Sequence, residues 1–445
     1  MAGTWTSQNK VLPGVYFRFR STQQSSVTVG DRGTVAICEP LAWGPVSTVM
    51  TINAGEDTTP YIGYPITSDN ARFLREMFKG TDRTNGAKTV LLYRPAASSS
   101  ASATVTVGNL TATAKYPGAR GNDIRIVITA NIDSTFTVDT VVDGDIVNEQ
   151  LSISAVSGLV DNDWVTWSGS GTLTASAGAS LTGGANGTVA TATYSTFLTA
   201  IEPYKFDILA YDGTESTVIA AFETFIVSQN ELNGIYSQLV VANAPTGPNS
   251  RYTVNVVSNA DLADGTALTA NQVVWWAAGA LAGASYNESL TNAAYPEAVG
   301  TTLQTATQIA TALAAGKFVL AADSGRVYVV QDINSLTTYT ADITEVYRYN
   351  KTIRLCNTIA NDLSAEFSAN YLGVVNNNAQ GRAMFKAAIV GYLLQIEGNE
   401  GIQNFSADDV TVEQGVNINS VLVTIVVHPV GTAEKIYVTI AMEVE

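Results

Sequence analysis

Side chains that could serve as a nucleophile or a general base are scarce in this sequence. Its 445 residues include one histidine, His428, and two cysteines, Cys38 and Cys356. His428 has no carboxylate close to it in the sequence that could orient its imidazole ring, and no G-x-S-x-G motif marks a serine nucleophile. A Cys38–His428 dyad is compatible with the composition, but two ordinary structural residues are the simpler interpretation. The sequence therefore indicates no catalytic site, and we predict a protein that is not an enzyme.

Metal and nucleotide sites have as little support. Two cysteines and one histidine are too few for a cysteine- or histidine-based zinc site or for a disulfide framework. Gly316-Lys317 lacks the preceding glycine of a Walker loop, and Gly169-Ser170-Gly171 lacks the third glycine of a dinucleotide fingerprint. Two acidic clusters lack the EF-hand pattern and are typical of solvated turns: Asp139, Asp143 and Asp145, and Asp161 with Asp163. We therefore predict neither a metal nor a cofactor.

Charge is sparse and mostly negative. Charged residues make up 14% of the chain, against roughly 25% in an average soluble domain, and the net charge is −16. This charge opposes binding to nucleic acid and docking on anionic lipid. No stretch resembles a signal peptide or a membrane span of about 20 apolar residues, so we expect synthesis and retention in a cytosol. The scarcity of charge indicates that much of the surface lies against other protein.

The order of helix and strand patterns indicates one domain inserted into another. Buried strands are predicted at 35–38 and 89–93, with a helix between them, and the same β/α alternation returns after residue 194. From 96 to 194 the chain is rich in Ser, Thr, Ala, Gly and Val, and short strand patterns separated by turns predict a small β-sandwich or barrel. An α/β domain interrupted by a β domain follows from this order.

The last hundred residues predict helices at 342–363 and 379–396 and strands at 410–413, 421–428 and 435–444. The predicted fold class is therefore α/β plus β, ending in an α+β domain. Its parts are, in chain order, an N-terminal arm (1–20), a central α/β domain (21–95 and 195–340) with an inserted β-sandwich (96–194), a C-terminal α+β domain (341–430) and a C-terminal strand arm (431–445).

Both ends of the chain carry the two-residue period of a strand with one buried face. In the first arm the alternating segment is Val15, Tyr16, Phe17, Arg18 and Phe19. In the last arm one predicted face consists of Ile436, Val438, Ile440, Met442 and Val444. A terminal strand must join a sheet, which can belong to the same chain or to a neighbour. Addition of a strand to another subunit's sheet is an established mode of recognition, in which backbone hydrogen bonds supply affinity.

The helix predicted at 379–396 is apolar nearly all round, which predicts burial. Arg382 and Lys386 lie in its early turns, where a cation opposes the helix dipole at a cost of about 0.3–1 kcal/mol each. An anionic partner outside the chain would offset this cost. The alternative is an internal salt bridge to Glu366 or Glu397.

Motifs along nearly the whole chain resemble the tail sheath proteins of contractile phages and phage-like bacteriocins. No single motif is decisive, but their order is that of the family. The matching segments are Pro13-Gly14-Val15-Tyr16, Gly33-Thr34-Val35-Ala36, Trp43-Gly44-Pro45, the stretch 112–124, Leu209-Ala210-Tyr211-Asp212-Gly213, Tyr371-Leu372-Gly373, Asn376, Gly381-Arg382, Tyr392-Leu393, Gly401-Ile402-Gln403-Asn404-Phe405 and Asp409-Val410.

The resemblance implies a central α/β domain of the kind called subtilisin-like, without the protease's activity. It further implies subunits stacked in hexameric rings around an inner tail tube protein, first in an extended metastable lattice. Contraction of that lattice would drive the tube through a target cell envelope. The arms would add strands to neighbouring sheath subunits, and Arg382 and Lys386 would contact the tube. Further partners would be baseplate and tail terminator proteins, in a virion tail assembled in the bacterial cytoplasm.

A second class of function stays open beside this one. Low charge and a Ser/Thr-rich insert also suit a surface adhesin or a protein that decorates a capsid. Such a protein would be monomeric or trimeric, and trimming of its ends would not affect it.

Overall fold

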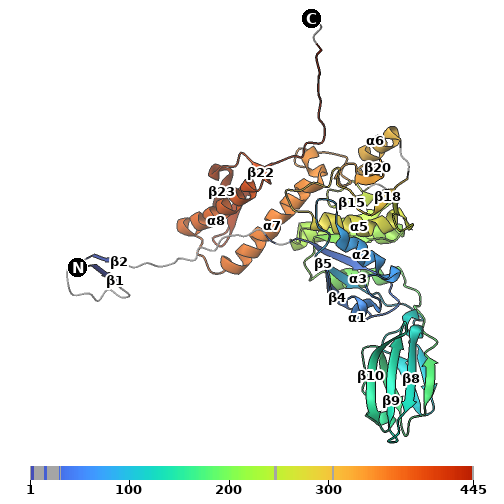
Figure 1. The fold of residues 1–445 in the computed structure, drawn as a ribbon. Helices are drawn as coiled ribbons and strands as arrows, with labels where there is room; N and C mark the ends of the chain where they lie inside the picture. The colour runs from blue at the N-terminus through green and yellow to red at the C-terminus, as the bar shows by residue number, and fades with distance from the viewer. Residues whose placement is uncertain are drawn as a thin grey trace. The chain divides into compact units, whose positions relative to one another are not determined.

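The computed structural model describes residues 2–4, 15–17, 30, 32–244, 248–302 and 305–442 (Figure 1). The chain forms two compact units. The larger unit comprises the described residues of 31–361 together with those from Gly431 onward. The smaller unit comprises Asp362–Val430 with the described part of the first 30 residues. None of the helices in the described ranges has the length and hydrophobicity needed to cross a membrane.

A seven-stranded sheet forms the centre of the larger unit. Its strand order is β19-β15-β14-β13-β3-β5-β4, and all neighbours are parallel except β4, which is antiparallel to β5. The strands are β3 (Thr34–Cys38), β4 (Val49–Asn53), β5 (Thr89–Tyr93), β13 (Ile208–Tyr211), β14 (Gln238–Ala242), β15 (Thr253–Val256) and β19 (Lys317–Phe318). Their continuous apolar runs are typical of parallel strands buried on both faces.

Helices cover both faces of this sheet. Val35 and Ile37 of β3 pack in one core with α2 (Arg72–Lys79) and α5 (Ala270–Gly283). The intervening residues Ala36 and Cys38 belong to the other core, with α3 (Thr193–Ile201) and α4 (Ser216–Ser228). The remaining elements of this unit are α1 (Thr59–Ile62), α6 (Ala306–Ala314), the small sheet β16 (Ala260–Leu262), β17 (Ala267–Leu268) and β18 (Ala298–Gly300), and the hairpin β20 (Leu320–Asp323) and β21 (Arg326–Val329).

The two helices on the first face approach so closely that only glycine fits at their crossing. A Cβ atom at Gly279 of α5 would overlap the backbone carbonyl group of Met77 in α2, and one at Gly283 would overlap that of Asn85. Trp276 of α5 donates its indole N–H to the carbonyl of Gly80, 2.7 Å away. Close backbone packing and one buried hydrogen bond therefore hold this helix pair against the sheet.

The predicted insert is a sandwich of two antiparallel sheets, β10-β9-β8-β12 and β11-β7-β6. Alternate residues of its strands, such as Ile124, Ile126 and Ile128, point into one core, which also takes in Trp43 from the central part of the chain. The strands are β6 (Thr104–Val107), β7 (Leu110–Ala114), β8 (Ile124–Ala130), β9 (Phe136–Val142), β10 (Asp145–Ile153), β11 (Val165–Gly169) and β12 (Ser176–Ser180). The chain is thus a mixed α/β protein with a β-sandwich-like domain, in agreement with the coarse fold prediction.

The helix predicted from residue 342 begins later, at Asn350, and α7 runs to Asn370. A short 3₁₀ turn, Glu345–Arg348, precedes it, and Tyr349 has extended backbone angles that interrupt the helix. Asp332, which is buried, accepts hydrogen bonds from the Asn350 side chain (2.9 Å) and from the Arg354 guanidinium (2.7 Å). These buried contacts stabilise the start of α7 at Asn350. Asp332 lies 18 residues before Asn350, outside the helix, so the periodicity of the helix itself does not reveal this start.

The smaller unit is built on α8 (Ala379–Gly398), whose N-cap Asn378 accepts a hydrogen bond from the Gly381 N–H. Tyr392 of α8 donates a hydrogen bond to Asp362, which also accepts one from the Gly30 N–H. The unit's strands form two antiparallel ladders, β22 (Ile402–Gln403) with β25 (His428–Pro429) and β23 (Val410–Gln414) with β24 (Val421–Ile425), and the first residues add a parallel pair, β1 (Ala2–Thr4) with β2 (Val15–Phe17). The predicted strand 421–428 is therefore two shorter strands.

Candidate assembly surfaces

The C-terminal arm is extended, and the structure assigns no strand to its described residues 431–442 (Figure 1). Ile436, Val438, Ile440 and Met442, which the alternation assigns to one face, are 81%, 74%, 79% and 89% exposed. Tyr437 of the opposite face is exposed as well. Val444 lies outside the described residues. The arm thus carries the side-chain pattern of a half-buried strand, but in the described chain no sheet pairs with it and its apolar side chains face solvent.

Glu434 fixes the root of this arm to the larger unit. One carboxylate oxygen accepts a hydrogen bond from the Thr291 hydroxyl at 2.9 Å, and the other accepts one from the Gln331 side-chain amide at 2.6 Å. Glu434 is half-buried, whereas Lys435 and the residues after it up to 442 are exposed. The anchor therefore ends where the alternating pattern begins. Sequence reasoning missed Glu434, because no local pattern marks its two distant partners.

The N-terminal arm is described over two short segments. Val15, Tyr16 and Phe17 form β2, at the place where the alternation predicts a strand, and they pair with the chain's own residues Ala2–Thr4. Arg18 and Phe19, which belong to the same predicted strand, lie outside the described residues. Pairing of this strand with another copy stays a prediction.

The smaller unit offers edges that could receive a strand. Each of its two antiparallel ladders has two strands in the described chain, so each ladder leaves its outer backbone edges without a sheet partner there. Apolar side chains beside the longer ladder are exposed, among them Leu422 and Val426, and Val416 and Ile418 are exposed in its turn. Open edges flanked by exposed apolar side chains are suited to pairing with an extended segment.

Helix α8 is buried along one face instead of all round. Phe385, Ile389 and Leu393 are buried, but Met384 and Leu394 are half exposed on the described surface of the isolated chain. The prediction of all-round burial was therefore wrong for a single copy, because the unit supplies no second layer over that side.

The cations of α8 have no internal ion pair among the described residues. Arg382 donates its Nη1 hydrogen to the side-chain oxygen of Asn377 at 3.0 Å, so a neutral amide satisfies part of the guanidinium without neutralising its charge. The two carboxylates considered as alternatives have other partners: Glu366 accepts from Asn370, and Glu397 accepts from the Phe405 N–H. The charges of Arg382 and Lys386 thus remain available to an external anion.

The residues considered for catalysis are not brought together in one unit. Cys38 ends β3 in the larger unit, whereas His428 lies exposed on β25 in the smaller unit. Burial raises the pKa of the Cys38 thiol, which opposes the thiolate form that a nucleophilic cysteine needs. Within the described ranges no group of three or more His, Cys, Asp or Glu side chains is placed to hold a metal ion.

Sequence reasoning also missed a buried pair of carboxyl groups. Glu39 and Asp212 directly follow β3 and β13, which are parallel neighbours in the sheet, so their side chains meet at its carboxyl edge. Burial, reinforced by the neighbouring Asp212, raises the pKa of Glu39 well above its usual range, and burial also raises the pKa of Asp212. Trp275 donates its indole N–H to Asp212 at 2.9 Å. Both shifts favour one proton shared by the two groups, held mainly by Glu39, over two ionised carboxylates.

Comparison with known families covers almost the entire chain. Four family models match in succession: the tail sheath protein Gp18 domain III N-terminal region over residues 32–94, the phage tail sheath protein beta-sandwich domain over 96–186, the phage tail sheath protein central domain over 187–335 and the phage tail sheath C-terminal domain over 342–443. Together these four matches run from residue 32 to residue 443, and all four describe parts of a phage tail sheath protein.

Full-length relatives agree with these matches. The phage-like element PBSX protein XkdK of Bacillus subtilis is 32% identical and aligns over 98% of both chains. Among solved structures, a sheath tail protein from Desulfitobacterium hafniense is 39% identical, covers 97% of this chain and 100% of its own, and superposes with a TM-score of 0.86. A sheath tail protein from Listeria innocua is 30% identical, covers 93% and 95%, and has a TM-score of 0.78. The chain therefore belongs to the phage tail sheath family, as a structural component of a contractile phage tail or of a phage-like particle.

Proposed function

We propose that this protein is the subunit that polymerises as stacked hexameric rings around an inner tube. The polymer contracts from an extended metastable lattice and drives the tube through a target cell envelope. The observation that carries the proposal is the C-terminal arm, which has the pattern of a strand, exposes its apolar side chains and has no sheet of its own in the described chain.

The arm of one copy adds a strand to an open ladder edge in the smaller unit of a neighbouring copy. Each backbone hydrogen bond formed in this way contributes about 0.5–1.5 kcal/mol, and burial of the apolar face adds about 25 cal/mol for each Å² removed from water. Because Glu434 tethers the described part of the arm at its root, the bodies of the subunits can shift while the strand stays paired. Such a hinge suits a lattice with two stable arrangements. The N-terminal strand acts in the same way.

The central domain acts as a scaffold and has no enzymatic role. Its parallel sheet and covering helices are compatible with the description subtilisin-like, but the single histidine lies on β25 of the smaller unit. Contraction needs no cofactor, because the free energy is stored in the packing of the extended lattice. The other partners are baseplate and tail terminator proteins, in a particle assembled in the bacterial cytoplasm, without direct contact with nucleic acid or insertion into a membrane.

Arg382 and Lys386 contact the inner tube, which must then present acidic side chains. Neither cation has an ion pair in the described chain, so an outside carboxylate could pair with each. Arg382 also lies in the first turn of α8, where the helix dipole disfavours a cation. We expect the double variant Arg382→Glu/Lys386→Glu to form sheath polymers alone but few extended sheaths on tubes. Electron microscopy of sheath and tube protein produced together measures the proportion of sheaths that are extended on a tube. Normal tube-bound extended sheaths in the variant would remove these residues from the interface.

Negative-stain electron microscopy of the purified protein, at rising concentration and without a partner, tests the function itself. Hollow helical tubes or stacked rings are the expected result. An adhesin or capsid-decorating protein would instead stay dispersed in the same series. Dispersed particles both alone and after production together with a tube protein would contradict the proposal.

A further inference from the structure

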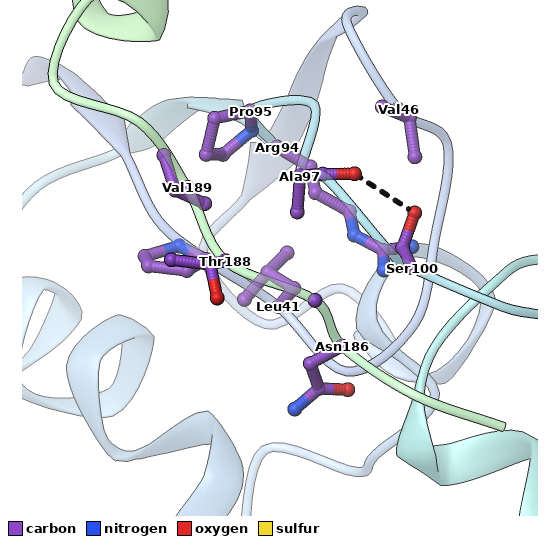
Figure 2. Close-up of a pocket in the computed structure, with 11 residues that line it drawn as sticks. Leu41, Val46, Arg94, Pro95, Ala97, Ser100, Asn186, Thr188 and Val189 are labelled. Atoms are coloured by element: carbon purple, nitrogen blue, oxygen red, sulfur yellow. Dashed lines mark hydrogen bonds between the residues drawn. The ribbon is translucent and has the colours of Figure 1, made fainter.

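A pocket of about 330 Å³ lies where the chain crosses into the β-sandwich and returns from it (Figure 2). The segment before the sandwich and the segment after it run side by side there, joined by an antiparallel bridge between Ser98 and Thr188. Figure 2 shows Leu41, Pro95 and Val189 around the same space, with Asn186 and Thr188 contributing polar groups. The pocket therefore belongs to the joint between two domains of the same compact unit.

Arg94 is the charged group of this pocket, and it is 3% exposed. Its Nη1 donates a hydrogen bond to the Gly44 carbonyl and its Nη2 donates one to the Pro117 carbonyl, each at 2.6 Å. Gly44 belongs to the central part of the chain and Pro117 to the sandwich, so this guanidinium joins the two domains. The two bonds use two of its five N–H donors.

The positive charge of Arg94 is not balanced within the described chain. Arg120, an equally buried arginine at the same joint, forms ion pairs with Asp123 at 3.0 Å and Asp143 at 2.5 Å. Arg94 bonds to neutral carbonyl groups, and no carboxylate among the described residues forms an ion pair with it. Burial lowers the pKa of Arg94 to about 10, so the group stays charged at neutral pH. A buried charge without a counterion is costly, and an anion in the adjoining pocket would reduce this cost.

The rim of the pocket can supply neutral donors. The Asn186 side-chain oxygen accepts the Ala119 N–H at 2.7 Å, which leaves its Nδ2 group to face another acceptor. The pocket is larger than one water molecule, and its volume lies at the lower end of the range of small-molecule sites. Charge-assisted hydrogen bonds from a guanidinium favour planar or tetrahedral oxyanions.

We propose that this pocket binds a small oxyanion, of the size of inorganic phosphate or acetate, with Arg94 as its counterion. The anion bridges the unused N–H donors of Arg94 and the segments that enter and leave the sandwich. Its binding therefore ties the inserted domain more firmly to the central domain. The site requires neither assembly nor the arms, so it is independent of the proposed lattice.

Titration of the dilute full-length protein with sodium phosphate, and separately with sodium acetate, tests the proposal. Isothermal titration calorimetry and the melting temperature are recorded against sodium chloride at matched ionic strength. The expected result is saturable binding with a rise in melting temperature beyond that in chloride, because a ligand that binds only the folded state stabilises it. Absence of saturable binding of both anions up to about 50 mM would overturn the proposal.

Three variants locate the site. Arg94→Met is expected to lower the affinity for the anion about 10- to 100-fold, which is the usual effect of removing charge-assisted hydrogen bonds. Arg75→Met is the control outside the pocket. Arg75 also donates to backbone carbonyls, those of Ile66 and Ser68, but unlike Arg94 it has a carboxylate partner, Asp69, at 3.9 Å. Its anion affinity is expected to equal that of the parent protein.

Asn186→Asp keeps the Ala119 bond and adds a carboxylate at the rim, which would compete with the anion. This variant is expected to lower the affinity for the anion at least about tenfold without lowering the melting temperature in chloride. If Arg94→Met does not fold, Asn186→Asp still tests whether the anion binds in this pocket. Unchanged affinity in either pocket variant would refute the assignment.

Discussion

Removal of residues 435–445 is expected to leave a folded protein that no longer forms sheath polymers. The apolar side chains of this arm are exposed in the isolated chain, so their loss takes little packing away from the fold. The truncation point keeps Glu434 and its hydrogen bonds to Thr291 and Gln331. Each subunit then lacks the strand that its neighbour's ladder edge would receive. Circular dichroism and the melting temperature should match those of the parent protein, and electron microscopy should show dispersed particles.

A pair of point variants tests whether polymerisation depends on the apolar face of the arm or only on the presence of the arm. Ile440→Asp places a charge on the face predicted to be buried in the acceptor sheet, whereas Thr439→Asp places the same charge on the opposite face. We expect Ile440→Asp to block polymers as the truncation does and Thr439→Asp to retain them. Equal behaviour of the two variants would argue against strand addition. Normal polymers from the truncated protein would exclude the arm as a contact between subunits.

Glu39→Gln is expected to stabilise the protein increasingly as the pH rises. Because the folded state raises the pKa of Glu39, it holds a proton that the unfolded chain releases above its ordinary pKa of 4.5. Stability therefore falls as the pH rises from that value toward the folded-state pKa, by at most about 1.4 kcal/mol per pH unit for one group. A glutamine amide can donate to Asp212 as the shared proton does and does not ionise, so this loss disappears.

The measurement is the difference in melting temperature between variant and parent from about pH 5 to pH 8. This difference should grow steadily in favour of Glu39→Gln as the pH rises. The other groups around Glu39, which are Asp212, Cys38 and Trp275, are the same in variant and parent. Glu149→Gln, at an exposed position, is the control and should show a difference that does not depend on pH in this range. A constant difference for Glu39→Gln, or one that shrinks as the pH rises, would contradict the shared proton.

Local pattern was sufficient for much of the architecture. The short apolar runs that became β3, β5 and β13, alternating with helix patterns, predict an α/β domain, and the short strand patterns separated by turns from 96 to 194 predict the sandwich. The arm pattern at 435–444 likewise shows in the sequence alone. Ordered motifs along the chain then placed it in the sheath family, which the full-length relatives confirm.

Contacts between distant residues decided the rest. Helix α7 starts at Asn350 rather than 342 because Asp332 binds its first turn, and Arg94 is buried because Gly44 and Pro117 close over it from two domains. The proton-sharing pair of Glu39 and Asp212 exists because two parallel strands, far apart in the sequence, end side by side. Periodicity records which faces of an element are buried. Which groups meet there, and which are left without a counterion or a sheet, depends on topology and on the energy of burying charge, so the tertiary structure alone determines it.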